Sequence, residues 1–249
     1  MADLTIAGLR GMPEILPGAN LPALIVEAIG RARLEVDDGD VFVVTQKIVS
    51  KANGRLVRLD SVEPSAPAIE FGRRAGKDSR LIEVILRESV RIVRMERGVI
   101  IAETRHGFVC ANAGVDGSNV AAGFVTLLPE NPDEDARAIR DALTESLDRH
   151  IGVIVSDTFG RPWRLGQVNV AIGSAGVKPL VDYRGCLDAS GQRLQSTVIG
   201  VADQLASAAE LVMGKLSAVP VAILKGAAAL LGDGRAADLI RPSDEDMFR

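Results

Sequence analysis

Short runs of apolar residues, separated by turns rich in glycine and acidic residues, set the pattern of this chain. Residues 41–45 and 151–156 are nearly continuous apolar runs with β-branched side chains, which is typical of strands buried on both faces of a sheet. Further short runs predict strands, and apolar spacings of three or four predict helices. The expected strands are 4–9, 90–94, 99–103, 108–111, 195–199 and 219–224, and the expected helices are 21–33, 132–147 and 201–213, with a polar helical stretch at 64–90.

These elements do not follow a regular strand–helix–strand order, so the pattern predicts a mixed α+β fold rather than a doubly wound sheet. No internal repeat, low-complexity tract or linker interrupts the chain. Residues 1–249 are therefore expected to form a single unit.

Composition narrows the class of protein. Of 249 residues, 47% are hydrophobic and 25% are charged, with a net charge of −4, and this excludes an intrinsically disordered chain. Only 3% are aromatic, which together with the negative charge argues against nucleic-acid binding. The most apolar run, 219–231, contains Lys225 and is shorter than the roughly 20 residues that a membrane span requires. Without a basic-then-apolar leader at the start, we expect a cytoplasmic protein with no membrane partner.

The cysteines, Cys110 and Cys186, lie far apart and without CxxC spacing. This usage predicts two buried thiols in a reducing compartment rather than a disulfide.

One segment imitates a phosphate-binding loop. Residues 72–78 (GRRAGKD) have three residues between the glycines instead of four, end in Asp instead of Ser or Thr, and follow a polar segment rather than a buried strand. No GxGxxG sequence is present either. The fold is therefore expected to be neither a P-loop nor a Rossmann fold.

Two acidic residues are the better candidates for chemistry. Asp157 directly follows the apolar run 151–156, and Asp116 lies in the glycine-punctuated turn 112–119. Carboxylates in such positions suit a hard divalent cation, which takes oxygen ligands and keeps waters or substrate phosphates. Each acid could instead bond its own backbone as a turn or cap residue. The residues alone leave both interpretations open.

Positive charge follows the same segments. Arg161 and Arg164 come shortly after Asp157, Lys178 follows the segment 171–177, and Lys47 and Lys51 follow the run 41–45. Arginine and lysine near carboxylates can neutralise a transferring phosphoryl group, although any one of them can simply be a solvated surface charge. His106 is a candidate base or phosphate ligand, or a structural donor. The candidates for a catalytic residue are Arg161, Lys178 and His106, and none is preferred. His150, at the end of the helix 132–147, is interpreted as structural.

Three longer motifs make the pattern specific. The segments 112–119 (NAGVDGSN), 153–161 (VIVSDTFGR) and 171–176 (AIGSAG) strongly resemble the coenzyme F420-0:L-glutamate ligase (F420-0:gamma-glutamyl ligase) family. Supporting matches are 45–55 (TQKIVSKANGR) and 201–204 (VADQ), and the likeness runs from about residue 8 to about residue 243.

The resemblance implies a GTP-dependent ligase that joins L-glutamate, and then further γ-linked glutamates, to coenzyme F420-0 through an acyl phosphate. It also implies a two-part fold particular to the family, with two interleaved subdomains of unknown boundary, a homodimer, and Mg²⁺ or Mn²⁺ as cofactor, with K⁺ as a further candidate. By position, Asp116 and Asp157 match metal ligands, and Thr158 matches a ligand of a second metal. The matches to GTP contacts are Met12, Pro13, Glu14, Ile15, Gln46, Lys51, Asn119, Met213, Gly214 and Lys215.

One position departs from the family pattern. Archaeal members carry an acid that helps to bind the second metal where this chain has Lys215, and a charged lysine cannot ligate a metal. The version here resembles the ligase half of bacterial two-domain members, without their C-terminal flavin-reductase-like domain. Two alternatives to the ligase remain: a metal-dependent phosphohydrolase that uses the same acids to activate water, and a nucleotide-binding module without turnover.

Overall fold

The computed structural model describes residues 3–247. Its helices are α1 (Leu21–Ala32), α2 (Gln46–Ala52), α3 (Ala66–Ala75), α4 (Ser79–Arg87), α5 (Pro132–Leu147) and α6 (Val201–Met213). Its strands are β1 (Thr5–Leu9), β2 (Val41–Thr45), β3 (Leu56–Arg58), β4 (Ser89–Glu96), β5 (Val99–Thr104), β6 (Val109–Ala111), β7 (Phe124–Thr126), β8 (Gly152–Arg161), β9 (Arg164–Ala175), β10 (Leu180–Asp182), β11 (Val198–Gly200) and β12 (Val221–Lys225). The fold is mixed α/β, as the pattern predicts.

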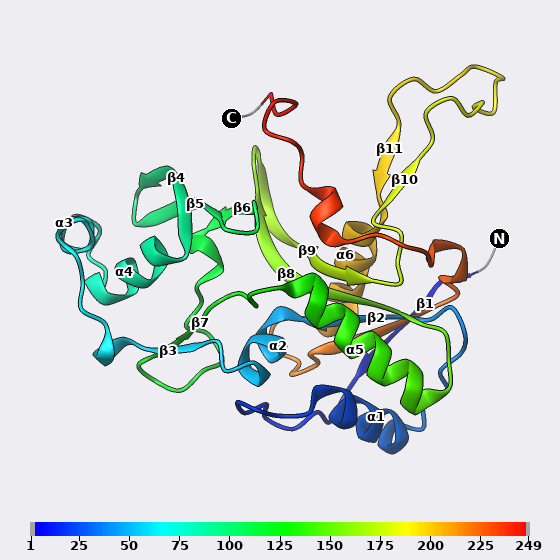
Figure 1. Ribbon diagram of the computed structural model, residues 1–249, viewed down its shortest axis with the longest axis horizontal. Coiled ribbons are helices and arrows are strands. Elements are labelled where there is room, and N and C mark those ends of the chain that lie inside the picture. The colour runs from blue at the N-terminus through cyan, green and yellow to red at the C-terminus, as the bar shows by residue number, and fades with distance from the viewer. Residues whose placement is uncertain (1–2, 248–249) are drawn as a thin grey trace.

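A five-stranded sheet in the order β1-β12-β2-β8-β9 forms the centre of the larger part. Only β2 and β8 are parallel, and the other pairs are antiparallel. Successive side chains of β2 point to opposite faces, so Phe42 and Val44 enter one core while Val41 and Val43 enter the other. Helices α1, α2 and α5 cover the first face, and α6 covers the second (Figure 1). Burial on both faces explains why these strands are continuously apolar.

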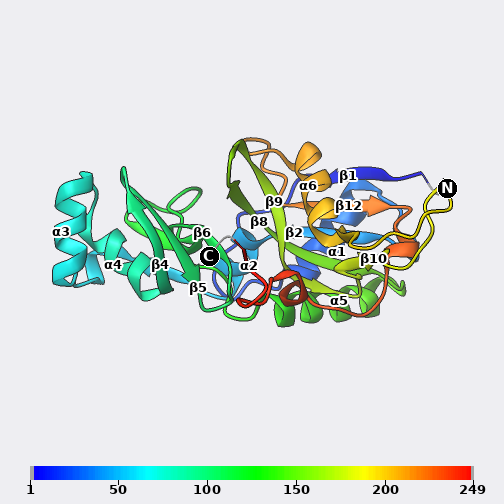
Figure 2. The same ribbon diagram turned by 90° about the horizontal axis from the view of Figure 1, so that it is seen from above.

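The chain between α2 and α5 forms a second part, which lies at one end of the molecule in both views (Figures 1 and 2). Strands β4, β5 and β6 form an antiparallel sheet, and α3 and α4 pack against it around Phe71, Ile82 and Ile100. The short pair β3–β7 connects this part to the central sheet. The pocket described below lies where the two parts meet.

Residues 72–78 join two helices and do not form a phosphate loop. Gly76 ends α3 in the left-handed conformation, at φ 64°, and the carboxylate of Asp78 accepts a hydrogen bond from the Arg80 amide at 2.9 Å to cap α4. Among residues 3–247, no helix is long and apolar enough to cross a membrane.

Strands β3, β7 and β10 are not predicted by the sequence pattern, and the polar helical stretch 64–90 divides into α3 and α4. Three further segments also differ from the sequence-based expectation. The run at 151–156 does not end before Asp157 but continues to Arg161 and turns back as β9, so segment 171–176 is mostly buried strand. Residues 46–52 form α2, which the sequence pattern does not predict. The strand expected at 195–199 is shifted to Val198–Gly200, because only these residues pair with β10.

Glu83 ties the two helices of the outer part together. One carboxylate oxygen accepts hydrogen bonds from the Ser65 amide at 2.9 Å and the Ser65 hydroxyl at 2.5 Å, and the other accepts from Arg87 Nε at 2.8 Å. Hydrogen bonds from Ser65 and then Arg87 lower the pKa of Glu83 from 4.5 to about 2. The ionised Glu83 carboxylate is therefore the form that stabilises the start of α3.

Glu83→Gln is expected to reduce the free energy of unfolding by about 1–2 kcal/mol at pH 7, since hydrogen bonds to a charged group are lost or weakened. A lowered pKa means that this contribution is complete above about pH 4.5 and is lost as the pH falls toward 2. Urea unfolding should therefore show a smaller difference in free energy of unfolding between wild type and Glu83→Gln at pH 3 than at pH 7. Glu70→Gln, at an exposed ion pair on α3, is the control and should change stability little. If wild type and Glu83→Gln differ in stability by the same amount at both pH values, the ionised Glu83 carboxylate is not what stabilises the start of α3.

Candidate active site

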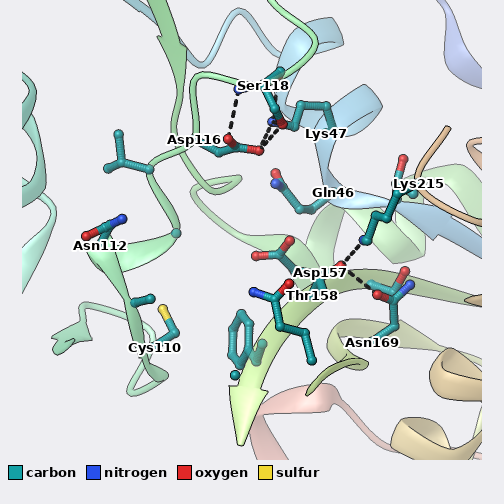
Figure 3. A pocket seen from close by; sticks show the side chains of 18 of the residues that line it. Gln46, Lys47, Cys110, Asn112, Asp116, Ser118, Asp157, Thr158, Asn169 and Lys215 are labelled. Atoms are coloured by element: carbon teal, nitrogen blue, oxygen red, sulfur yellow. Dashed lines mark hydrogen bonds and ion pairs between the residues drawn. The ribbon is translucent and has the colours of Figure 1, made fainter. Parts of the chain in front are cut away.

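A polar pocket of about 400 Å³ lies between the central sheet and the outer part. Its walls come from the β2–α2 junction, the segment from β6 to Asn119, the β8–β9 hairpin and the turn after α6 (Figure 3). Among the sequence-predicted residues, the pocket brings together Gln46, Asp116, Asn119, Asp157, Thr158 and Lys215. Segments that are remote in the sequence therefore meet in one place.

Asp116 lies just after the short 3-10 turn Asn112–Gly114 and is fixed at both backbone and side chain. Its backbone exchanges two hydrogen bonds with Thr126, and its carboxylate accepts hydrogen bonds from the Ser118 amide at 2.8 Å and the Ser118 hydroxyl at 2.5 Å. Lys47 forms an ion pair with the same carboxylate. Burial acts to raise the pKa of Asp116, but the hydrogen bonds from Lys47 and Ser118 outweigh it and leave the pKa lowered. Asp116 is thus an ionised carboxylate whose position is fixed by hydrogen bonds and an ion pair.

Asp157 has a different environment, although it lines the same pocket. It lies within β8, opposite Val170 of β9, and burial raises the pKa of its carboxyl group from 3.8 to about 6. Hydrogen bonds from the Thr158 backbone and the Gln46 side chain, and the more distant charges of Lys47 and Lys215, counteract only part of this rise. Within residues 3–247, no lysine, arginine or histidine forms an ion pair with Asp157. A half-buried carboxylate without an ion-pair partner is costly to keep ionised, so this site favours a bound cation.

The donor set fits one hard divalent cation. Among residues 3–247, no three His, Cys, Asp or Glu side chains cluster in a metal-binding arrangement, so an ion here would have Asp116 and Asp157 as its acidic ligands. Amide and hydroxyl oxygens, waters and an anionic ligand would complete its shell. Mg²⁺ is commonly held in this way, by one or two carboxylates plus substrate phosphates.

Two lysines from different elements bring positive charge to the pocket (Figure 3). Lys47, on α2, contacts Asp116 and donates to the Ser118 carbonyl at 3.0 Å. Lys215 follows α6, contacts the Thr158 hydroxyl and lies 3.5 Å from Glu210. Ammonium groups beside carboxylates suit a ligand with several negative charges that binds together with a cation.

The other predicted nucleotide contacts lie elsewhere. Lys51 is buried and pairs with Glu14 at 2.5 Å, which ties the loop 12–15 to α2. Ile15 belongs to the core on the first face of the central sheet, Met12 packs against that core, and Met213 is the buried last residue of α6. Gly214 ends α6, and neither it nor Pro13 is among the pocket-lining residues.

None of the three candidate catalytic residues lines this pocket. Arg161, at the end of β8, donates to the Leu165 and Gly166 carbonyls at the start of β9, and exposed Lys178 donates to the Ala229 carbonyl at 3.4 Å. His106 lines a second cavity of about 420 Å³, and its Nε2 lies 3.0 Å from the Glu130 carbonyl. His106 stacks on Phe108, which packs edge-on against Phe159 of the main pocket.

Three polar residues that bond the predicted site residues, Lys47, Ser118 and Asn169, are absent from the site that the sequence predicts. The sequence predicts Lys47 only as a positive charge near the site. Its position just after the buried strand 41–45 could have marked it as a site residue. Ser118 lies within the motif 112–119 and could have been found from its spacing to Asp116, since an Asx turn bonds the amide two residues on. Asn169 had no signal, because β9 reads as an irregular segment.

The two cysteines have opposite environments, which corrects the expectation that both are buried. Cys110 lines the pocket and is buried, and burial raises the pKa of its thiol to about 12. Cys186 is exposed in the long connection between β10 and β11.

A thiol reagent such as Ellman's reagent is therefore expected to modify only Cys186 in the folded protein at pH 8, because Cys110 stays protonated and inaccessible. Cys186→Ser should abolish the fast reaction, and unfolding in guanidinium should restore one reactive thiol. Two fast-reacting thiols in the native wild type would contradict this structure of the pocket wall.

The fold and the pocket define a class of protein: a mixed α/β protein whose main pocket joins two carboxylates to two ammonium groups between its two parts. Comparison with known proteins gives the family. The model of the F420-0:Gamma-glutamyl ligase family matches residues 10–226, and the chain belongs to this family.

Curated relatives match along nearly the whole chain. A protein named coenzyme F420:L-glutamate ligase from Methanothermobacter thermautotrophicus is 44% identical over 249 residues, covering 99% of each chain. Proteins of the same name from Methanocaldococcus jannaschii and Methanopyrus kandleri are 44% and 46% identical, over 88% and 95% of this chain and 88% and 94% of their own.

Proposed function

We propose that this protein is a GTP-dependent ligase that forms an amide between coenzyme F420-0 and L-glutamate and then adds further γ-linked glutamates. The observation that carries the proposal is that Asp116, Asp157, Lys47 and Lys215 meet in one pocket of a chain that belongs to the F420-0:gamma-glutamyl ligase family. The names of the relatives give the same acceptor and amino acid.

The first step transfers the γ-phosphoryl group of GTP to a carboxylate oxygen of F420-0. The bond between the γ-phosphorus and the bridging oxygen breaks, GDP leaves, and an acyl phosphate forms. Such transfers depend mainly on positioning and on neutralising the phosphate charge. Lys47 and Lys215 supply positive charge to the pocket, which Gln46 and Asn119 also line. The Gln46 side chain accepts a hydrogen bond from Ser50 and donates one to Asp157, so it holds Asp157 in place.

In the second step the neutral amine of glutamate attacks the carbonyl carbon of the acyl phosphate. The C–N bond forms, the C–O bond to phosphate breaks, and the amine proton leaves with the phosphate as hydrogen phosphate. The lysines that hold the phosphoryl oxygens also favour phosphate as the leaving group.

Asp116 and Asp157 would hold Mg²⁺ or Mn²⁺, and such an ion neutralises the charge that develops on the transferred phosphoryl group. Asp157 favours this role because it has no ion-pair partner in the described chain, and Asp116 because hydrogen bonds keep it ionised.

A homodimer is part of the proposal. The β4–β5–β6 sheet leaves Val90, Val93, Val99 and Val109 exposed, which supports a contact with a second copy. Light scattering of the purified protein should give about twice the chain mass. A mass equal to one chain would exclude the dimer and leave the ligase proposal intact.

The decisive experiment is a GDP-release assay with purified protein, GTP, Mg²⁺, F420-0 and L-glutamate. The ligase predicts GDP release only when F420-0 is present, with amide product only when glutamate is present as well. GDP release without either acceptor would indicate a phosphohydrolase. Nucleotide binding with no release under any combination would indicate a binding module. Replacing GTP by ATP in the same assay tests the nucleotide.

A further inference from the structure

A closed ring of four polar side chains lies at one edge of the pocket, and three of them, Thr158, Asn169 and Lys215, line it. The Thr158 hydroxyl donates to Asn169 Oδ1 at 2.6 Å, Asn169 Nδ2 donates to Glu210 Oε2 at 2.8 Å, and Lys215 Nζ lies 3.5 Å from Glu210 Oε1. Lys215 closes the ring by donating to Thr158 (Figure 3). The ring joins β8, β9, α6 and the turn after α6.

The hydrogen-bond capacity of the Thr158 hydroxyl shows how much of it the ring already uses. A threonine hydroxyl has one hydrogen to donate and two lone pairs that accept. Its hydrogen goes to Asn169 and one lone pair receives the Lys215 ammonium. A metal ion on this hydroxyl would have to displace that ammonium or sit within a few ångströms of its charge. The second metal expected at Thr158 therefore does not fit the residues present.

Charge balance separates the two carboxylates from the ring. Lys47 forms an ion pair with Asp116, and within residues 3–247 Asp157 has none. In the ring, Glu210 and Lys215 form an ion pair and balance each other. A divalent cation gains most from uncompensated carboxylates and least beside a fixed ammonium.

We propose that the ammonium of Lys215 takes the place of a second metal ion, so that each chain binds one divalent cation, at Asp116 and Asp157, and holds the far side of the phosphate group with Lys215. The inference rests on the proposed function, and it adds that Thr158, Asn169 and Glu210 position a lysine rather than a metal. Asn169 is buried and further fixed through its carbonyl by the Ser207 hydroxyl at 2.7 Å, so the ring has a rigid base.

The test counts bound Mn²⁺ by the electron paramagnetic resonance signal of the free ion, without nucleotide. Wild type is expected to bind about one Mn²⁺ per chain, since Asp157 has no ion pair within residues 3–247 and Asp116 lines the same pocket. Lys215→Glu is expected to bind about two, because it removes the ammonium and adds an oxygen ligand beside Thr158 and Glu210. Lys178→Glu, the same charge change at an exposed lysine outside the pocket, is the matched control and should stay at about one.

Two Mn²⁺ per wild-type chain, or an unchanged count in Lys215→Glu, would overturn the inference. Absence of any Mn²⁺ from wild type would overturn it too, together with the metal site of the proposed function. Wild type that binds two Mn²⁺ and still releases GDP only with F420-0 would refute the role of Lys215 and leave the ligase standing.

Lys215→Gln keeps the experiment informative if Lys215→Glu does not fold. It removes the positive charge without adding a carboxylate, so the count should remain at about one Mn²⁺ while the Kd for GDP rises about tenfold or more, as expected for the loss of one charged contact to phosphate. An unchanged Kd for GDP would show that Lys215 does not face the phosphates.

Discussion

Asp157→Asn is expected to lower GDP release at least about 100-fold, the loss that follows removal of one group that stabilises transition-state charge. Asparagine keeps the size of the side chain but removes the negative charge that would hold the cation. The free energy of unfolding at pH 7 should stay the same or rise by up to about 3 kcal/mol. The reason is that each unit by which folding raises the pKa of Asp157 corresponds to about 1.4 kcal/mol of destabilisation when the acid is ionised. Steady-state kinetics and urea unfolding on the same preparation measure both effects.

Asp135→Asn provides the control for Asp157→Asn. Burial also raises the pKa of Asp135, which lies on α5, outside the pocket, and accepts a hydrogen bond from Asn53 at 2.8 Å. Its replacement should leave GDP release unchanged. Near-normal activity in Asp157→Asn, or an equal loss in Asp135→Asn, would remove the metal role from Asp157.

Gly114→Ala is expected to have the largest effect on stability. Gly114 has φ 73°, and an added Cβ would lie 2.5 Å from Cγ of Leu128, a buried core residue. Asn112 and Ala113 before it are also left-handed, at φ 55° and 52°, so this turn cannot relax easily to make room. The combined conformational and steric cost is about 3–4 kcal/mol, measurable as a lower urea midpoint. Activity should fall as well, because the turn carries Asp116.

Gly123→Ala isolates the conformational part of that cost. Gly123 has φ 82°, and an added Cβ would meet no atom within 4 Å. Its replacement should cost about 1–2 kcal/mol from the left-handed backbone alone. Equal losses in the two variants would mean that Leu128 shifts without penalty and that packing does not fix the turn.

The elements that the sequence predicts well are those whose pattern reflects burial. The run 41–45 is a strand because all its apolar side chains are covered, whichever face they point to. The helix at 132–147 keeps its predicted bounds, since its apolar spacing matches one buried face. The β8–β9 hairpin escaped prediction because it leaves the core after Asp157, where Arg161 and Trp163 are polar or exposed and carry no period-two apolar signal.

The residues of the pocket also divide into those that the sequence predicts and those that it does not. Asp116 and Asp157 stand out in the sequence, because Asp116 lies in a glycine-punctuated turn and Asp157 directly follows an apolar run. Asn169 does not, because its role depends on β9 folding back beside Thr158 and on α6 presenting Glu210. Arg161, Lys178 and His106 were chosen for their chemical type, and the fold places all three away from the main pocket lining.

The sequence by itself determined the mixed α/β class, the absence of a phosphate loop at 72–78 and the family, since these depend on local patterns of burial and on motifs. The tertiary structure alone decided which charges act together: that Asp157 has no ion pair within residues 3–247, and that Lys215 contacts Thr158 and Glu210. The physical reason is that electrostatic and hydrogen-bond energies depend on separation in space and on burial, and residues as far apart in the chain as Thr158 and Lys215 come into contact only when it folds.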